Sequence, residues 1–217
     1  LPRIVVLRPE ARDAARGVEQ FLPLQGRAFE CRELARETLA TICYTSGTSG
    51  RPKGVMLSHG NIIANVEQCR ATALARDDDV FLSILPLSHM FERTGGYYLP
   101  LAIGAKVVYS RGIAQIPEDL VSQSPTAMFA VPRIFEKFNA KLTDALAASP
   151  VKRALFDACV ARGYRAASGR AGLVDRALVP LLRALVAKPV LAKLGGRMRL
   201  SVVGGAALDP ALATTLI

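Results

Sequence analysis

The stretch that decides the fold reads Tyr44-Thr-Ser-Gly-Thr-Ser-Gly-Arg-Pro-Lys-Gly-Val55. Two apolar runs, residues 39–44 and 55–57, bound it and predict short strands. Glycine lets the backbone turn tightly and approach a ligand closely, and successive amide groups in such a turn form a concavity that binds anions. Hydroxyl side chains add rotatable donors, and Lys53 adds a mobile positive charge. The stretch is therefore predicted to bind the phosphates of a nucleotide.

Two other interpretations of this stretch fit less well. Gly, Ser and Thr also fill ordinary solvated hairpin loops, but here every position from Thr45 to Gly50 is small or hydroxylic and a lysine follows. The Walker A pattern requires Gly-x-x-x-x-Gly-Lys-Ser/Thr at the start of a helix. Lys53 is instead followed by Gly54 and an apolar run, so we expect a phosphate loop outside the Walker class.

The stretch resembles the phosphate-binding signature of the adenylate-forming enzymes, which include acyl-CoA synthetases, luciferases and the adenylation domains of peptide synthetases. That signature is close to Tyr-Thr-Ser-Gly-Thr-Thr-Gly-x-Pro-Lys-Gly-Val, and Ser49 is the only departure from it. The resemblance implies that the ATP phosphates are bound by a set made of Thr45, Ser46, Gly47, Thr48, Ser49, Gly50 and Lys53. It also implies that the Thr45 hydroxyl contacts a magnesium ion.

A second motif occupies residues 86–96, directly after an apolar run from Val80 to Leu85 that predicts a strand. A strand that ends in Pro, Ser and His and leads into an apolar helix presents side chains at the carboxyl edge of an α/β sheet. The run Pro-Leu-Ser-His-Met-Phe-Glu-Arg resembles a motif of the long-chain fatty acid–CoA ligases, most closely the bacterial ones. The resemblance implies that His89 and Phe91 lie beside the carboxyl and acyl groups of the substrate. Taken alone, His89 is more typical of a core histidine.

Two further segments resemble the same ligases. Gly204-Gly205-Ala206 follows a predicted strand, and the resemblance implies that Gly204, Gly205 and Ala206 lie against the adenine and the acyl pocket. Val-Pro-Arg-Ile-Phe-Glu-Lys begins a predicted helix in which Arg133 and Glu136 are one turn apart. We expect those two side chains to pair, in a structural role.

The predicted strands alternate with predicted helices, which indicates an α/β fold with a mostly parallel sheet layered with helices. The expected strands are 80–85, 105–109, 126–131 and 200–203. The expected helices are 60–74, 116–122, one that starts at Pro132, and a helical region from 150 to about 193. Ser58 is predicted to cap the first of these helices, which directs Ile62, Ile63, Val66 and Cys69 to the core. Asp77-Asp78-Asp79 is interpreted as a turn, because three consecutive residues cannot all reach one metal ion.

Composition narrows the class of protein. The chain has 217 residues, enough for a domain with a real core, and no apolar stretch approaches the roughly 18 residues that span a membrane. Its four cysteines are not at metal-ligand or redox spacing, so we predict buried, reduced thiols and a cytoplasmic protein. With only two histidines, a zinc site is not expected.

The ends of the chain suggest a piece of a larger protein. It opens at Leu1 without a methionine or signal peptide, and it stops at Ile217 inside a predicted helix. By resemblance, residues 1–217 are an incomplete N-terminal adenylation domain. The family's Tyr-Gly-x-Thr-Glu motif, its ribose-binding acid and its C-terminal domain with the catalytic lysine would lie beyond Ile217. No residue of the chain is therefore assigned as catalytic, and the chain alone is expected to be inactive.

The net charge of +10 is concentrated in one region. Residues 151–200 hold eleven Lys or Arg and two Asp, a local balance of +9. Two interpretations stay open for the stretch 151–199. Its helices could lie on the inner face of a membrane with leucines inserted, or the leucines could pack on the sheet while the cations face water. Nucleic acid ranks last, because the segment has one aromatic pair and no nucleic-acid-binding motif.

Together the resemblances imply a two-step acyl activation. ATP and a fatty acid would give an acyl adenylate and pyrophosphate, and coenzyme A would then take the acyl group. Magnesium and ATP are the implied cofactors, and fatty acid and coenzyme A the implied partners. Two alternatives remain: a ligase for an aryl or shorter acid, and a non-catalytic module that binds nucleotide or membrane.

Overall fold

The structure is a computed structural model that describes residues 32–46 and 51–216. The chain divides into two compact units, residues 1–35 and 36–217. Of the first unit only residues 32–35 are described, and every described helix and strand belongs to the second unit. Of the predicted phosphate set, Gly47, Thr48, Ser49 and Gly50 lie outside the described residues.

The predicted strands around the phosphate stretch form an antiparallel hairpin. Its strands are β1 (Leu39–Thr45) and β2 (Lys53–Ser58), and Thr45 pairs with Lys53 across the ladder. Side chains alternate between the two faces of a strand, and one face of the hairpin carries the exposed side chains of Ile42, Tyr44 and Met56. A Cβ at position 54 would lie 3.0 Å from Ile42 Cγ2, so glycine suits this crowded face.

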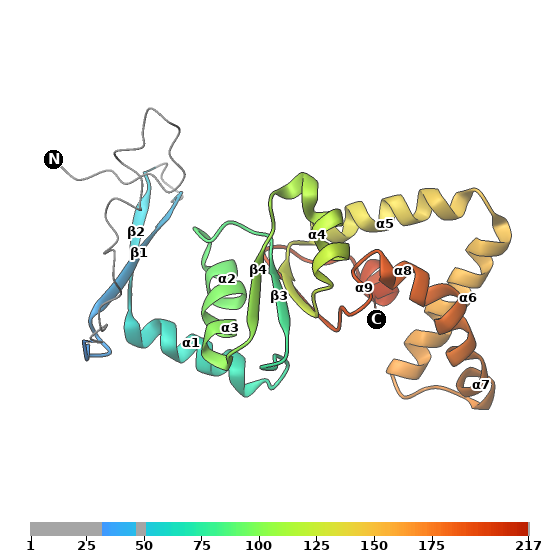
Figure 1. The fold of residues 1–217 in the computed structure, drawn as a ribbon, viewed down its shortest axis with the longest axis horizontal. Coiled ribbons are helices and arrows are strands. Elements are labelled where there is room, and N and C mark those ends of the chain that lie inside the picture. The colour runs from blue at the N-terminus through green and yellow to red at the C-terminus, as the bar shows by residue number, and fades with distance from the viewer. Residues whose placement is uncertain (1–31, 47–50, 217) are drawn as a thin grey trace, which may run out of the picture. The chain divides into compact units, whose positions relative to one another are not determined.

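The main sheet has four parallel strands in the order β4 (Lys106–Tyr109), β3 (Val80–Ser83), β5 (Ala127–Ala130) and β6 (Leu200–Val203). This confirms the predicted mixed α/β fold (Figure 1). From β3 the chain first adds β4 on one side and then β5 on the other. In sheets with such a reversal, ligands bind outside the carboxyl ends of the strands beside it.

Helices fill the connections between the strands. In chain order they are α1 (His59–Ala71), α2 (Met90–Glu92), the π-helix η3 (Arg93–Tyr98), α3 (Leu99–Ile103), the 3-10 helix η4 (Ile113–Gln115), α4 (Ile116–Gln123), α5 (Pro132–Ala147), α6 (Pro150–Ala167), α7 (Leu173–Leu182), the π-helix η5 (Arg183–Ala187), α8 (Lys188–Ala192) and α9 (Pro210–Leu216). None of the helices in the described ranges has the length and apolar character needed to cross a bilayer.

The predicted Ser58 cap is confirmed, and Asp209 caps a second helix. The Asn61 amide donates to Ser58 Oγ at 3.2 Å, while the Ser58 amide donates to Asn61 Oδ1 at 3.0 Å, which makes a reciprocal cap at the start of α1. At α9 the Ala211 amide donates to Asp209 Oδ1 at 2.6 Å. These contacts satisfy amide groups that the first helical turn leaves without partners.

The alternation of side chains along β3 and β5 builds a core on each face of the sheet. Phe81, Ala127 and Phe129 pack with Val66 of α1 and Leu99 of α3. On the other face, the core contains Leu82, Met128 and Ala130 together with Ile116 and Leu120 of α4 and Phe135 of α5. Helices therefore cover both faces, as the α/β pattern predicts.

Two predictions made from the sequence are wrong. Val66 is buried and Ile62 and Cys69 are half-buried, but Ile63 is 41% exposed because it lies further round α1 than the buried face. Arg133 and Glu136 are both exposed on α5, and within the described chain they form no ion pair with each other. In an exposed ion pair, the weak electrostatic attraction barely offsets the loss of side-chain entropy when two long side chains are held in place.

Asp79 ties the amino ends of three strands together. Its side chain is buried and accepts hydrogen bonds from Thr126 Oγ1 at 2.6 Å, from Arg199 Nε at 2.9 Å and from the Arg76 amide at 2.8 Å. Arg199 also donates to Leu74 O at 2.9 Å. Burial favours the neutral acid, but these hydrogen bonds outweigh it and hold the pKa of Asp79 below its usual value.

The thiols were predicted to be buried, but the three that the structure describes are only half-buried. Cys43, Cys69 and Cys159 are free, and burial raises the pKa of Cys159. Cys31 lies outside the described residues. Cytoplasmic localisation stays a prediction.

Candidate substrate site

An apolar cavity of about 590 Å³ lies between the hairpin, α1 and the segment that follows β3. Thr45 lines it from the end of β1, where the chain enters the phosphate stretch, and Phe91 lines it from the second motif. Phe129 and Val202 contribute from the sheet. Thr45 and Phe91 are 46 residues apart in the sequence, and the two motifs that contain them meet at one cavity.

The apolar wall of the cavity is built around Phe91. Its ring packs edge-on against Phe129, with 5.4 Å between ring centroids and 73° between planes. A Cβ at position 204 would lie 2.8 Å from Phe91 Cζ, and a Cβ at position 95 would collide with the ring of Phe129. Glycine at 95 and 204 therefore lets backbone approach both rings closely. The structure brings together Phe91 and Gly204, which the sequence assigned to one site.

The other predicted acyl-site residues lie at the carboxyl edge of the sheet but do not line this cavity. His89 is exposed, is the N-cap residue of α2, and makes no capping hydrogen bond with its side chain. Gly205 has φ +80° and Ala206 is exposed in the turn after β6. The structure places these residues near the end of the sheet where ligands bind in such folds.

Besides Thr45, the structure describes two of the residues that were predicted to bind phosphate. Ser46 follows β1, and Lys53 begins β2 directly opposite Thr45. Both are exposed. Asn61 and Asn65 line the cavity from α1, one helical turn apart, and neither was predicted from the sequence. Their spacing of four on the helix surface was the available signal.

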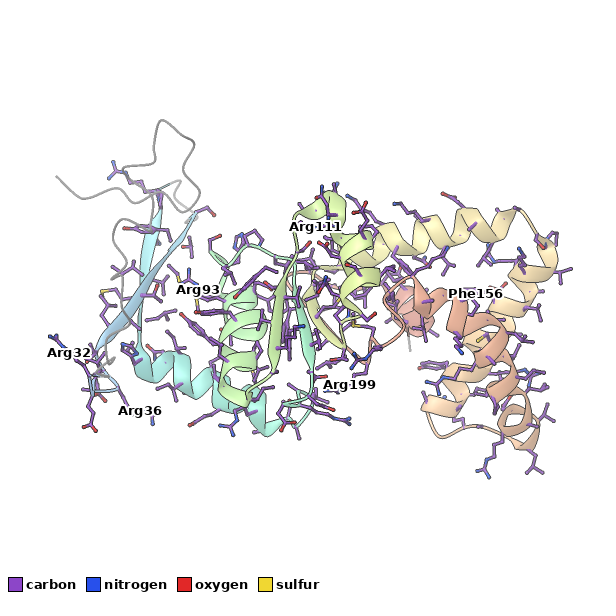
Figure 2. The ribbon with its side chains drawn as sticks, viewed as in Figure 1. Arg32, Arg36, Arg93, Arg111, Phe156 and Arg199 are labelled. Atoms are coloured by element: carbon purple, nitrogen blue, oxygen red, sulfur yellow. The ribbon has the colours of Figure 1, made fainter. Side chains whose placement is uncertain are left out.

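Arg93 links the two motifs. Its Nε donates to Leu87 O at 2.7 Å, and its Nη1 donates to Thr41 Oγ1 at 3.0 Å and contacts Cys43 Sγ at 3.7 Å. Figure 2 labels Arg93 beside the hairpin. Leu87 belongs to the second motif, while Thr41 and Cys43 belong to the strand that enters the phosphate stretch. One guanidinium group therefore fixes the position of both segments.

Glu92, the residue before Arg93, is fully buried, and neither of its carboxylate oxygens has a hydrogen-bond partner among the described residues. A Cβ at Gly96 would collide with Oε1. Burial raises the pKa of Glu92, and the nearby Ser83 side chain and Ile84 amide offset this only in part. This burial was not predicted from the sequence, because a charged residue next to arginine usually faces solvent.

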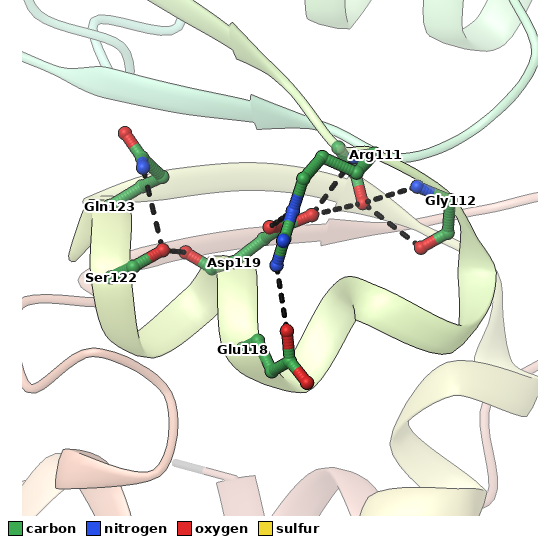
Figure 3. Close-up of polar contacts among 7 residues, drawn as sticks. Arg111, Gly112, Glu118, Asp119, Ser122 and Gln123 are labelled. Carbon is green, nitrogen blue, oxygen red and sulfur yellow. Dashed lines mark hydrogen bonds and ion pairs between the residues drawn. The ribbon is translucent and has the colours of Figure 1, made fainter.

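A second, more polar cavity of about 410 Å³ lies beside the end of β4. Figure 3 shows its charges already paired: Arg111 contacts Asp119 at 2.7 Å and Glu118 at 2.9 Å, and Ser110 donates to Asp119 at 2.8 Å. The Arg111 amide also donates to Asp119, and this contact is the main reason that the pKa of Asp119 is lowered. The cluster stabilises the turn after β4.

The exposed side chain of Thr45 could serve as a single protein contact for a magnesium ion. Across residues 32–46 and 51–216, no group of three or more His, Cys, Asp or Glu side chains is placed to hold a metal. Magnesium in nucleotide sites takes few protein ligands and completes its shell with phosphate oxygens and water. The exposed Thr45 suits such a single contact.

Comparison with known proteins decides the family. The model of the family described as AMP-binding enzyme matches residues 4–217. The chain belongs to the AMP-binding enzyme family. This confirms the resemblance to adenylate-forming enzymes that the stretch Tyr44–Val55 carries.

Curated relatives of this AMP-binding chain include long-chain acyl-CoA synthetases. It is 36% identical over 178 residues to the peroxisomal long chain acyl-CoA synthetase 7 of Arabidopsis thaliana, covering 80% of this chain and 24% of the relative. It is also 36% identical over 187 residues to long-chain-fatty-acid–CoA ligase 1 of Homo sapiens, covering 84% and 26%. The chain thus spans about a quarter of the length of these relatives.

A solved structure supports the fold. The N-terminal subdomain of NpsA from Klebsiella oxytoca, solved in complex with 3-hydroxyanthranilyl-AMSN, matches with a TM-score of 0.52 and 17% identity. The match covers 88% of this chain and 37% of that one.

Proposed function

We propose that the protein carrying this chain is an ATP-dependent long-chain fatty acid–CoA ligase. The observation that carries the proposal is the apolar cavity with Thr45 of the phosphate stretch at one part of its wall and Phe91 of the acyl motif at another. A fatty acid has an apolar chain and a carboxylate that must meet ATP. One cavity shared by the two motifs suits that requirement, and the long-chain acyl-CoA synthetases among the relatives agree with it.

The phosphate end of the site is assigned to Thr45–Gly50 and Lys53. Backbone amides and hydroxyls of the stretch would hold the phosphates, with the Lys53 ammonium as a mobile cation opposite Thr45. The Thr45 hydroxyl would contact magnesium, which neutralises charge on the phosphates when it is bound.

The acyl end is assigned to Phe91 and the apolar lining, with His89 near the carboxylate. Gly204, Gly205 and Ala206 leave room for the adenine and for the acyl group at the carboxyl edge of the sheet. Phe91, Phe129 and Val202 provide an apolar wall with few polar groups, as is typical of small-molecule sites.

The reaction follows from these assignments. A carboxylate oxygen of the fatty acid attacks the α-phosphorus of ATP, and the bond to pyrophosphate breaks. The acyl carbon of the adenylate is then attacked by the thiol of coenzyme A, and AMP leaves with the bonding electrons. Charge accumulates on the phosphates in the first step, so amides and Lys53 that face them lower the barrier electrostatically.

Pyrophosphate exchange into ATP by the full-length enzyme tests the phosphate assignment. A charge-assisted contact is worth roughly 1.5–3 kcal/mol, so Lys53→Ala should slow exchange by tens of fold or more. Lys137→Ala, at an exposed position on α5, is the matched control and should leave it unchanged. Normal exchange by Lys53→Ala would reject the assignment.

The identity of the acid needs a second experiment. Exchange should be supported by long-chain fatty acids and not by benzoate or acetate. Preference for an aryl or short acid would instead favour a different ligase of the same family. Nucleotide binding without exchange by the full-length protein would favour a non-catalytic module. Residues 1–217 expressed alone should show no exchange above background.

A further inference from the structure

Helix α7 and its continuation η5 present an apolar stripe to solvent. Leu173 is 84% exposed, Val174 62%, Leu181 55% and Leu185 64%. Ala177 and Ala184 are also exposed and fill the spacing of three and four residues along the same side. Single exposed leucines are ordinary on protein surfaces, but a continuous row along one helix side indicates a binding surface.

The opposite side of the helix is fixed against α6, so the stripe cannot turn inward. Asp175 is buried and receives Arg162 Nη1 at 2.7 Å and Arg165 Nη2 at 2.9 Å, both from α6. The hydrogen bonds from Arg165 are the main reason that the pKa of Asp175 lies far below its usual range. Leu178 and Leu182 follow Asp175 at helical spacing and are half-buried.

The structure therefore distinguishes buried from exposed leucines in this region, which the sequence pattern could not do. Leu178, Leu182 and Val186 lie on the side that packs on α6, while Leu181 and Leu185 face solvent. The buried side of the helix therefore packs on α6 rather than on the sheet, while the exposed side is free for another contact. Leu173 and Val174 extend the exposed side by two further turns, to the start of α7.

The charges around the stripe are strongly unbalanced. Both acidic residues of the region are already paired, Asp157 with Arg153 and Asp175 with Arg162 and Arg165. Arg199 is paired with Asp79. The remaining cations have no ion pair with any described residue: Lys152, Arg170, Arg176, Arg183, Lys188, Lys193 and Arg197.

We infer that the stripe Leu173, Val174, Leu181 and Leu185, with the adjoining Arg176, Arg183 and Lys188, binds the surface of an anionic lipid bilayer. An interfacial helix inserts its apolar side among the acyl chains while basic residues contact the headgroups, and this region carries both features. Nucleic acid would engage the cations but gives no reason for four exposed aliphatic side chains. The inference goes beyond ligase function and does not depend on it.

Binding of the full-length protein to vesicles tests the inference. Wild type should sediment with vesicles of phosphatidylcholine and phosphatidylglycerol at low salt, less at high salt, and weakly with phosphatidylcholine alone. Arg176→Gln/Arg183→Gln/Lys188→Gln should weaken binding about 100-fold, since each basic residue contributes roughly a fivefold factor. Lys137→Gln/Lys141→Gln on α5 removes exposed charge elsewhere and should have much less effect.

A second set of variants tests the apolar stripe of α7 and η5. Leu181→Gln/Leu185→Gln should weaken vesicle binding by at least about tenfold, because insertion of the aliphatic groups is lost. Leu101→Gln makes the same substitution at a similarly exposed site, 58%, on α3 and should bind as wild type. Pyrophosphate exchange and melting temperature should stay unchanged in the double variant.

Three results would overturn the inference. The first is absence of vesicle binding by wild type at low salt. The second is equal binding by wild type and Leu181→Gln/Leu185→Gln, which would leave a purely electrostatic contact. The third is a dimer that the leucine variants dissociate while vesicle binding is absent, which would assign the stripe to a second copy of the chain.

Discussion

Two buried carboxylates lie at opposite ends of the same strand, and their surroundings differ completely. Asp79 directly precedes β3 and accepts hydrogen bonds from Thr126, Arg199 and the Arg76 amide. Glu92 lies near Ser83 and Ile84, where β3 ends, and within the described part of the chain its oxygens have no hydrogen-bond partner. The pKa of Asp79 is lowered, whereas that of Glu92 is raised by burial.

The difference separates the end of the sheet that is tied together by polar contacts from the end that borders the proposed substrate cavity. At the amino end, polar groups bond to one another and join three strands. At the carboxyl end, Glu92 has no hydrogen-bond partner among the residues that the structure describes, and it lies in the sequence between Phe91, which lines the cavity, and Arg93, which ties the two motifs together. Parallel sheets bind ligands at this second end, and unpaired buried groups in proteins are expected mainly at functional sites.

Loss of the partner of Asp79 should have the largest effect on stability. Arg199→Ala leaves a buried carboxylate without its cation, which typically costs about 3–5 kcal/mol of the free energy of unfolding. Chemical denaturation of wild type and variant measures this cost. Arg153→Ala breaks an exposed pair with Asp157 and should change stability by no more than about 0.5 kcal/mol. Equal effects of the two substitutions would contradict a special role for the amino end.

Low pH should lower the free energy of unfolding by protonating Asp79 in the same hydrogen-bond network. Because the pKa of Asp79 is lower in the folded protein than in the unfolded chain, its contribution is present above the unfolded value, near 3.8, and is lost as pH falls through the folded value. Asp79→Asn should therefore flatten the loss of stability at acid pH. A denaturation series below pH 5 compares the two proteins, and an unchanged slope in the variant would reject this contribution.

Substitution of Arg93 should have the next largest effect, and it should lower enzymatic activity. Arg93→Ala removes contacts to both motifs, and one charge-assisted hydrogen bond is worth roughly 1.5–3 kcal/mol, so kcat/KM should fall about 10–100-fold. The KM for ATP and the KM for the fatty acid should both rise, because Arg93 positions β1 as well as the loop after β3. Arg133→Ala, exposed on α5, is the control. A change in melting temperature without any change in KM would reduce Arg93 to a structural residue.

The sequence predicts the local elements of the fold well, but it does not predict the surroundings of the two buried carboxylates. The hairpin, the four strands and the Ser58 cap follow from short-range patterns, and the motifs locate Thr45 and Phe91. Asp79 and Arg199 are 120 residues apart, so no local pattern joins them, and Asp79 is hidden in a run of three aspartates. The burial of Glu92 depends on close packing against Gly96, which only the folded chain shows.

Glu92 should give the smallest effect, with the opposite pH dependence to Asp79. Its pKa is raised in the folded state, so the stability it provides is present below the unfolded value, near 4.5, and is lost as pH rises through the folded value. Glu92→Gln keeps the shape and carries no charge, so it should be more stable than wild type at pH 8 and similar to it at pH 4. Thermal melts at both pH values measure this. A variant that is less stable at pH 8 would show that the carboxylate is charged and paired.

The central claim is that the cavity between the hairpin and β5 holds the acyl chain, and two adjacent residues of β2 test it most directly. Val55 lines the cavity, whereas Met56 lies on the outer face and is 71% exposed. The measurement is the kcat/KM of the full-length enzyme for fatty acids of increasing length. Val55→Trp should reduce it for the longest acids by roughly 10–200-fold, the range for a misplaced methylene in an apolar pocket, and leave shorter acids less affected. Met56→Trp should leave the profile as in wild type. An unchanged profile in Val55→Trp, or the same loss in both variants, would contradict the assignment of this cavity to the acyl chain.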